Sequence, residues 1–171
     1  IIGIVSVRIR GNENPMNALT RGYFFAIGLS ALGMFFVVSH MLSNHGLVGA
    51  GVVGIVTSVV VVFITQYYTE GRFRPVKAIV RASKTGPATN IVTGTAVGFE
   101  TTLATAVTIG VALLLAYFFG TKTGLPGGGA FGTAVATMGM LMTCPFILAE
   151  DTFGPITDNA NGINEFTGAG S

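Results

Sequence analysis

The sequence predicts an all-α, polytopic bundle of transmembrane helices, with four full spans and part of a fifth. Half of the residues are apolar and only 9% are charged, whereas about 25% are charged in ordinary soluble domains. The stretch from Gly22 to Thr69 contains no Asp, Glu, Lys or Arg. It is more than twice as long as the ~20 residues that a helix needs to cross a bilayer. Because lipid solvates apolar side chains directly, a membrane explains a chain that cannot supply a polar surface.

The charge-free stretch is predicted to form a helical hairpin. Polar residues from Ser43 to Gly46 interrupt it near the middle. We therefore expect one span from about Arg21 to Leu42 and a second from about Leu47 to Gln66. The apolar residues from Ile1 to Val7 are interpreted as the end of an earlier span. Membrane strands need only ~9–11 residues of alternating polarity, and these runs are longer and do not alternate.

The second half of the chain is predicted to add two spans. A polar, basic loop is expected from Tyr67 to about Thr89, followed by a span from about Asn90 to Phe119. The turn from Gly120 to Gly129 is rich in Gly and Pro, which break helices. The fourth span is expected from about Ala130 to Ala149. We interpret residues 1–171 as a single transmembrane region and as an internal piece of a larger membrane domain.

The basic residues predict the orientation of the chain. Short loops rich in Lys and Arg face the cytoplasm, and here one side carries eight basic residues while the other carries only Lys122. The eight are Arg8, Arg10, Arg21, Arg72, Arg74, Lys77, Arg81 and Lys84. That side is therefore predicted to be cytoplasmic, together with the residues from Asp151 onward. The formal net charge of +2 is too small to indicate a nucleic-acid partner.

Carboxylates that follow the fourth span form the clearest candidate site. Four of the seven acidic residues lie between Glu150 and Glu165. Asp151, Asp158 and Glu165 are spaced seven residues apart, which returns to nearly the same helix face, and Pro155 predicts a kink in that helix. Carboxylate oxygens suit Mg²⁺, which is commonly held together with the phosphate oxygens of a substrate. The stripe is a candidate cation site, although acids that are merely solvated beyond the membrane would show the same spacing.

Glu100 is the single charge inside the third predicted span. An ionised carboxylate in lipid costs several kcal/mol, so such residues usually face a protein interior, a partner or an ion path. Two interpretations stay open for Glu100: a place on an ion path, or a structural pairing with a basic-loop residue near the membrane surface. His40, His45 and Cys144 stand alone in the sequence and are interpreted as structural.

Two longer motifs resemble signatures of one protein family. The residues from Gln66 to Thr101 read QYYTEGRFRPVKAIVRASKTGPATNIVTGTAVGFET, which resembles the tyrosine motif of membrane-bound pyrophosphatases. The residues from Phe131 to Gly168 read FGTAVATMGMLMTCPFILAEDTFGPITDNANGINEFTG, which resembles the later acidic motif of that family. Gln66 stands where the family often has Glu, and Tyr67 and Tyr68 match tyrosines with a structural or interfacial role. The first third of the chain matches the family in hydropathy alone.

The resemblance implies a large helical membrane enzyme that is a homodimer in its full-length form. Such an enzyme hydrolyses pyrophosphate with Mg²⁺ at the cytoplasmic face and moves H⁺ or Na⁺ outward. The choice between H⁺ and Na⁺ stays open, and so does a requirement for K⁺. The distribution of the family implies a prokaryotic plasma membrane.

The resemblance also implies roles for single residues. Asp158 matches an aspartate that binds metal and pyrophosphate, and Asp151 matches the first aspartate of the same motif, with a less defined role. Glu165 matches the closing acid of that motif. No catalytic residue is identified, because the family's other acidic motifs, its catalytic lysines and its ion gate are absent from these 171 residues. This segment alone is therefore not expected to hydrolyse pyrophosphate.

Other classes of function stay open on the residues alone. A secondary transporter or channel subunit would use a kinked, acidic helix to bind a co-transported ion. A non-catalytic membrane scaffold would leave the same carboxylates exposed. Flanking helices rich in Asp would favour the pump over both alternatives.

Overall fold

The computed structural model describes residues 2–7, 15–42 and 44–168, and in these ranges the chain forms helices and turns without strands. The helices are α1 (Ile2–Ser6), α2 (Pro15–Val37), the π-helical turn η1 (Val38–Leu42), α3 (His45–Thr69), α4 (Arg74–Ser83), α5 (Pro87–Thr121), α6 (Gly128–Leu141) and α7 (Cys144–Thr167). The predicted all-α class is confirmed.

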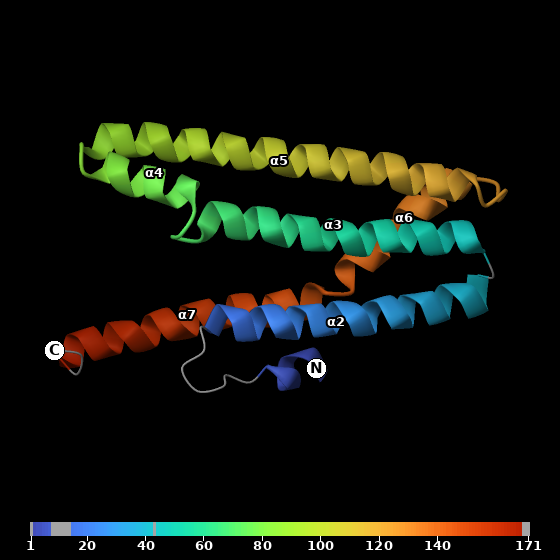
Figure 1. Ribbon diagram of the computed structural model, residues 1–171, viewed down its shortest axis with the longest axis horizontal. Helices are drawn as coiled ribbons and strands as arrows, with labels where there is room; N and C mark the ends of the chain where they lie inside the picture. The colour runs from blue at the N-terminus through green and yellow to red at the C-terminus, as the bar shows by residue number, and fades with distance from the viewer. Residues whose placement is uncertain (1, 8–14, 43, 169–171) are drawn as a thin grey trace.

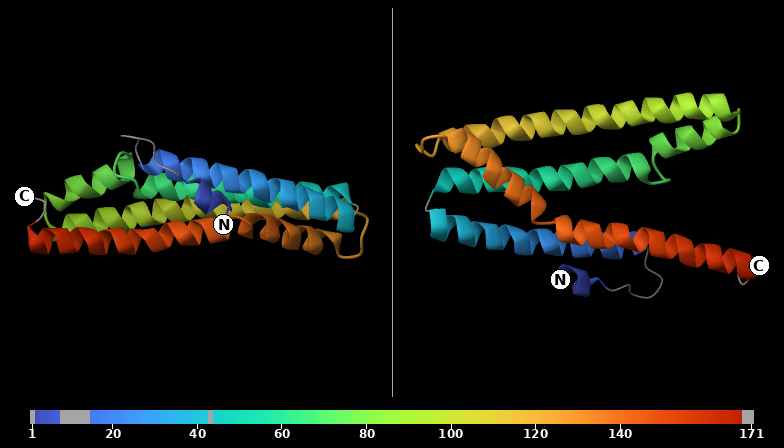
Figure 2. Two further views of the ribbon diagram at one scale, coloured as in Figure 1. Left: turned by 90° about the horizontal axis from the view of Figure 1, so that it is seen from below. Right: turned by 180° about the vertical axis from the view of Figure 1, so that it is seen from behind.

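The long helices lie with their axes roughly parallel and alternate in direction (Figure 1, Figure 2). One end of the bundle carries α4, the start of α5 at Pro87 and the end of α7 at Thr167, and we call it the basic end (Figure 1). The opposite end carries the turns from η1 to α3 and from α5 to α6, and we call it the distal end. There the side-chain amide of Asn44 donates to the carbonyl oxygen of Thr123 at 3.2 Å and so joins the two turns.

Three stretches are long and apolar enough to cross a membrane: Asn17–Leu42, His45–Ser83 and Pro87–Thr121. α6 and α7 pass the same test only as a pair, which is bent by 41°. The described residues therefore contain three candidate spans, or four if the bent pair counts as one. The predicted end of an earlier span corresponds to the five-residue helix α1.

α3 is the central helix of the bundle and the most buried of the three candidate spans. Its Leu47 and Ile55 pack with Met34 of α2 and Val38 of η1 into a small apolar core. On another side, α3 packs against α5 and α6. The apolar core therefore holds α2 and α3 together as the predicted hairpin.

α6 approaches α3 and α5 so closely that glycine is required at the contacts. A Cβ atom on Gly54 of α3 would overlap the carbonyl oxygen of Ala136 of α6. A Cβ atom on Gly132 of α6 would lie only 2.6 Å from the carbonyl oxygen of Ala116 of α5. Small residues allow membrane helices to pack backbone against backbone, so these glycines fix α6 in place.

Large apolar side chains cover the outside of the spans. Leu32, Phe99 and Leu114 are 69%, 72% and 74% exposed. In water this exposure would be unfavourable and would promote association, whereas lipid or neighbouring membrane helices solvate such surfaces. The exposed surface therefore supports the membrane environment predicted from composition.

The predicted basic loop from Tyr67 to Thr89 is wrong in part, because it contains the helix α4. From Arg74 onward, the basic residues of this segment recur at helical spacing and are all exposed: Arg74, Lys77, Arg81 and Lys84. Pro75, at the start of the helix, is buried. The segment is an amphipathic helix whose polar side was mistaken for a loop.

The predicted fourth span, from about Ala130 to Ala149, is not one unbroken helix, because the helix breaks at Met142 and Thr143; it is a span if the bent pair counts as one. Pro145 has no N–H group to bond to the carbonyl of Leu141, and its ring crowds that carbonyl. α6 therefore ends at Leu141 and α7 begins at Cys144. α7 continues as one helix through Pro155, where a kink was predicted. A bend of 41° lies between α6 and α7.

Candidate functional site

The three predicted acidic residues of the stripe lie on a single helix. Asp151, Asp158 and Glu165 all belong to α7, and all three are exposed. Their seven-residue spacing places them on the same side of that helix. The predicted helical stripe is confirmed, while its role in binding stays a prediction.

The first two carboxylates of the stripe are exposed and differ from the third in their contacts. Within the described residues, Asp151 and Asp158 form no hydrogen bond or ion pair, whereas Glu165 accepts a hydrogen bond from the side-chain amide of Asn161 at 3.1 Å. No three His, Cys, Asp or Glu side chains converge on a metal-sized site in the part of the chain that the structure describes. The stripe can therefore supply some ligands of a cation but not a complete set.

The acidic stripe extends toward the basic end of the bundle. The C-terminal half of α7, which carries Asp158 and Glu165, points to the end where α4 lies (Figure 1, Figure 2). Lys122 follows α5 at the distal end. Arg8 and Arg10 lie outside the described residues. The carboxylates and the basic helix are thus on the same side of the bundle, as the charge pattern predicts.

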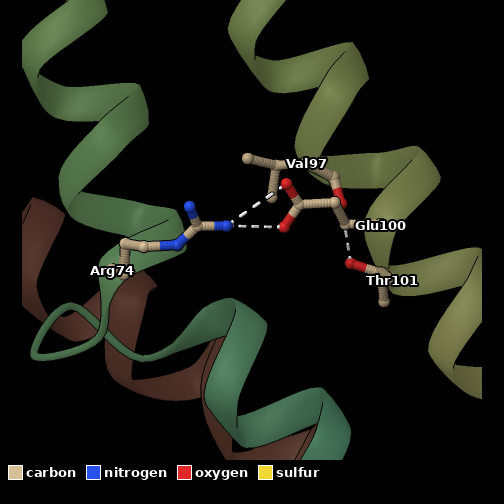
Figure 3. A network of polar contacts seen from close by, with 4 residues as sticks. All are labelled: Arg74, Val97, Glu100 and Thr101. Atoms are coloured by element: carbon tan, nitrogen blue, oxygen red, sulfur yellow. Dashed lines mark hydrogen bonds and ion pairs between the residues drawn. The ribbon is translucent and has the colours of Figure 1, made fainter.

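Glu100 forms an ion pair with Arg74. Nη2 of Arg74 lies 2.9 Å from Oε2 and 3.2 Å from Oε1 of Glu100, and this contact joins α4 to α5 (Figure 3). The adjacent Thr101 bonds to Val97 within its own helix (Figure 3). The structure thus shows the pairing with a residue of the basic segment, which is one of the two interpretations of Glu100, while a place on an ion path stays a prediction. Sequence reasoning did not name Arg74 as the partner, because the two residues are 26 positions apart.

The tyrosine motif forms part of the junction between α3 and α4. The ring of Tyr67 lies 5.1 Å from that of Tyr68 and 5.2 Å from that of Phe73, measured between ring centroids. Next to it, Nε of Arg72 lies 3.0 Å from Oε1 of Glu70. These contacts agree with the structural role that was predicted for the motif.

The two histidines lie near the distal end. Nδ1 of His40 lies 3.1 Å from the carbonyl oxygen of Phe36, and its ring stacks on the Phe36 ring at 4.3 Å. His45 opens α3 directly after Asn44, whose side chain caps that helix at the amide of Gly46. Both placements agree with the predicted structural roles.

Comparison with known proteins agrees with the two motifs. A family model described as inorganic H⁺ pyrophosphatase matches residues 1–171. The chain is 55% identical over 174 residues to the K(+)-insensitive pyrophosphate-energized proton pump 2 of Moorella thermoacetica. It is 46% identical over 183 residues to the K(+)-insensitive pyrophosphate-energized proton pump of Caldanaerobacter subterraneus subsp. tengcongensis. Each alignment covers 99% of this chain and 26% of the relative, so the chain spans about a quarter of the length of these two relatives.

A shorter relative is matched over most of its own length. The chain is 36% identical over 180 residues to the pyrophosphate-energized proton pump 2 of Mycoplana dimorpha, covering 98% of this chain and 83% of that protein. The long apolar helices agree with an integral, multi-pass membrane protein. Because the family model matches from the first residue to the last, the chain belongs to the inorganic H⁺ pyrophosphatase family.

Proposed function

We propose that this segment supplies a carboxylate-bearing helix to a membrane pyrophosphatase, which hydrolyses pyrophosphate at the cytoplasmic face and thereby pumps H⁺ outward. The observation that carries the proposal is the placement of Asp151 and Asp158 on one exposed side of α7, directed toward the basic end. The relatives named as pyrophosphate-energized proton pumps support the reaction.

The metal that we propose for this site is Mg²⁺. Asp158 and Asp151 offer exposed carboxylate oxygens that no described residue engages, and Mg²⁺ prefers such ligands together with phosphate oxygens. Because no complete set of ligands converges among the described residues, the remaining ligands belong to other parts of the protein and to pyrophosphate. When bound, Mg²⁺ neutralises charge on the phosphoryl group and acidifies an attacking water.

The length of the helices supports a site outside the hydrocarbon. Asp158 follows the start of α6 at Gly128 by 30 residues, which is about 45 Å along the helices. The hydrocarbon core is only about 30 Å thick. With Gly128 at the distal end, Asp158 extends beyond the core into water, where a phosphate substrate can reach it.

The basic end also suits an anionic substrate. The exposed basic side chains of α4 lie at the same end as the acidic stripe, and clustered positive charge raises the local concentration of an anion. The excess of basic residues at this end supports a cytoplasmic orientation. Cytoplasmic pyrophosphate would therefore meet a positive surface before it reaches the carboxylates.

The first test is Asp158→Asn in the full-length protein, assayed in membranes as phosphate release from pyrophosphate with Mg²⁺. We expect the rate to fall by at least ~10–100-fold, the loss that is typical for residues which only support a metal ligand. Thr157→Val is the matched control, because the neighbouring Thr157 is exposed and, among the described residues, its hydroxyl donates to Phe153 of its own helix. Equal rates in the two variants would refute the assignment. A transporter would instead move its ion without any phosphate release.

We further propose that the transported ion is H⁺ and that activity needs no K⁺, because the first two relatives are named K(+)-insensitive proton pumps. Inside-out vesicles of the full-length protein should acidify on addition of pyrophosphate in a buffer without Na⁺ and K⁺. A requirement for Na⁺ would show that Na⁺ is the transported ion, and a rate restored only by K⁺ would contradict the second part of the proposal.

The family resemblance also supports a homodimer of the full-length chain in a prokaryotic plasma membrane. The mass of the purified protein in detergent, corrected for bound detergent, should equal two chains. A mass of one chain at working concentration would contradict the dimer.

A further inference from the structure

Three buried hydroxyl groups meet at the break between α6 and α7. Tyr23 of α2, Ser58 of α3 and Thr143 of the break are 5%, 5% and 1% exposed. The hydroxyl oxygen of Ser58 lies 3.5 Å from that of Tyr23 and 3.4 Å from that of Thr143. We call these residues the hydroxyl cluster. It joins three segments that are far apart in the sequence.

Each hydroxyl of the cluster has an acceptor. The Ser58 hydroxyl donates to the carbonyl oxygen of Ile55 at 2.9 Å, so its oxygen is free to accept from Tyr23 and from Thr143. In this arrangement Ser58 accepts from Tyr23, and it shares the Thr143 hydroxyl with the carbonyl oxygen of Met140, which lies 3.4 Å from that hydroxyl. A buried donor that loses its acceptor is costly. Removal of the Ser58 hydroxyl therefore affects Tyr23 more than Thr143, which keeps Met140 as an acceptor, whereas removal of either neighbour leaves Ser58 bonded to Ile55.

The cluster lies where the direction of α7 is set. α6 is held against α3 and α5 by close glycine contacts. Phe146 is the single buried residue of α7 within the described part, and its ring lies 6.0 Å from the ring of Tyr23. The residues from Asp151 to Asn161 are all exposed. Among the described residues, α7 is thus anchored through its first two turns, from Cys144 to Glu150.

We propose that Ser58, together with Thr143 and Tyr23, is a positioning cluster that fixes the bend between α6 and α7 and so places the carboxylates of α7 in the pyrophosphate site. This inference rests on the proposed function. Asp158 lies 14 residues beyond Cys144, or about 21 Å along a helix, so a tilt of ~10° at the break moves it by ~4 Å. Misplacement by about 1 Å at a reacting centre can lower activity by ~100-fold.

The first experiment separates positioning from simple stabilisation by kinetics. The full-length protein carries Ser58→Ala, Thr143→Val or the conservative Thr143→Ser, and pyrophosphate hydrolysis with Mg²⁺ is measured per folded molecule. Thr57→Val is the matched control, because Thr57 is 7% exposed and its hydroxyl donates at 2.7 Å to Val53 within the same helix. We expect KM for pyrophosphate to rise ~10-fold in Ser58→Ala and less in Thr143→Val, and to stay normal in Thr143→Ser and Thr57→Val.

The second experiment does not depend on enzyme activity. Spin labels at the exposed positions Ile91 of α5 and Ile163 of α7, in a Cys144→Ser background, report the distance between the two helices. We expect the distance distribution to shift or broaden in Ser58→Ala and in Thr143→Val, and to stay unchanged in Thr57→Val.

The outcomes distinguish this inference from the proposed function. If the unaltered protein releases no phosphate, the proposed function fails, while the spin-label distances still report on the bend. A normal KM and normal distances in Ser58→Ala and Thr143→Val overturn the positioning role. A loss of folded protein that is equal in Thr57→Val and Thr143→Val, with KM unchanged in both, overturns it as well. If Ser58→Ala does not assemble, the pair Thr143→Val and Thr143→Ser decides.

Discussion

Glu100 shows how an apolar helix tolerates a carboxylate. Its side chain is 46% exposed and is paired with Arg74, which is 71% exposed. A charge that keeps a counter-ion avoids part of the cost of placing a carboxylate in an apolar helix. The contact joins α4 to α5, and a place on an ion path stays a prediction for Glu100.

A charge exchange tests this structural role. We expect Glu100→Gln and Arg74→Gln each to lower the thermal midpoint of the full-length protein modestly, and the two together to lower it no further than one alone, because both remove the same contact. The exchange Arg74→Glu with Glu100→Arg should restore the midpoint and pyrophosphate-driven pumping. Stability that returns without pumping would instead assign Glu100 to the ion path.

The helices show where sequence reasoning succeeds and where it fails. The charge-free run from Gly22 to Thr69 and the spacing of Asp151, Asp158 and Glu165 were sufficient to predict the hairpin and the acidic stripe. These features depend on composition and on helical period alone. For Glu100, the sequence predicted a partner from the basic segment but did not identify Arg74, because tertiary packing decides which basic residue lies opposite.

The boundaries that were wrong have specific physical causes. α4 was assigned to a loop because its basic side chains lower the mean hydropathy, although their spacing is helical. The break before Pro145 was not predicted, although Pro145, like Pro155, lacks a backbone donor. Tertiary contacts of Thr143 and Phe146 lie at this break, and the sequence does not display them.

The packing of α6 gives a prediction for a single helix contact. Gly54→Ala should destabilise the full-length protein by about 1–3 kcal/mol, because the added methyl group overlaps the carbonyl of Ala136. Gly110→Ala in α5 is the matched control, since its Cβ meets nothing within 4 Å, and better helix propensity should leave it neutral or up to about 1 kcal/mol more stable. The measurement is chemical or thermal unfolding in detergent. Equal effects of the two variants would show that α3 and α6 are not in close contact.

For the molecule as a whole, the charge distribution and the helix directions agree. The eight basic residues are predicted on one side of the membrane, and the described members of that set lie toward the end where α7 finishes. Lys122 lies with the turn from α5 to α6 at the other end. The acidic stripe of α7 and the basic helix α4 therefore lie on the same side of the membrane.

Labelling of introduced cysteines in intact cells tests this arrangement. All three tested positions are exposed, and Lys122 lies at the distal end, whereas Lys84 and Asn159 lie toward the basic end. In a Cys144→Ser background, Lys122→Cys should therefore react with a membrane-impermeant maleimide added outside. Lys84→Cys and Asn159→Cys should react only after permeabilisation. Labelling of Lys84→Cys and Asn159→Cys from opposite sides would contradict the shared end and, with it, the proposed pyrophosphate site.

The length of α5 has a consequence for the outline of the protein in a lipid nanodisc. Its 35 residues measure about 52 Å, whereas the hydrocarbon layer measures about 30 Å. Since α5 ends at the distal turn, most of its length beyond the hydrocarbon lies at the basic end, where α4 runs beside it. In electron-microscopy projections, α5 should therefore extend about 20 Å beyond the hydrocarbon on one leaflet and little beyond it on the other.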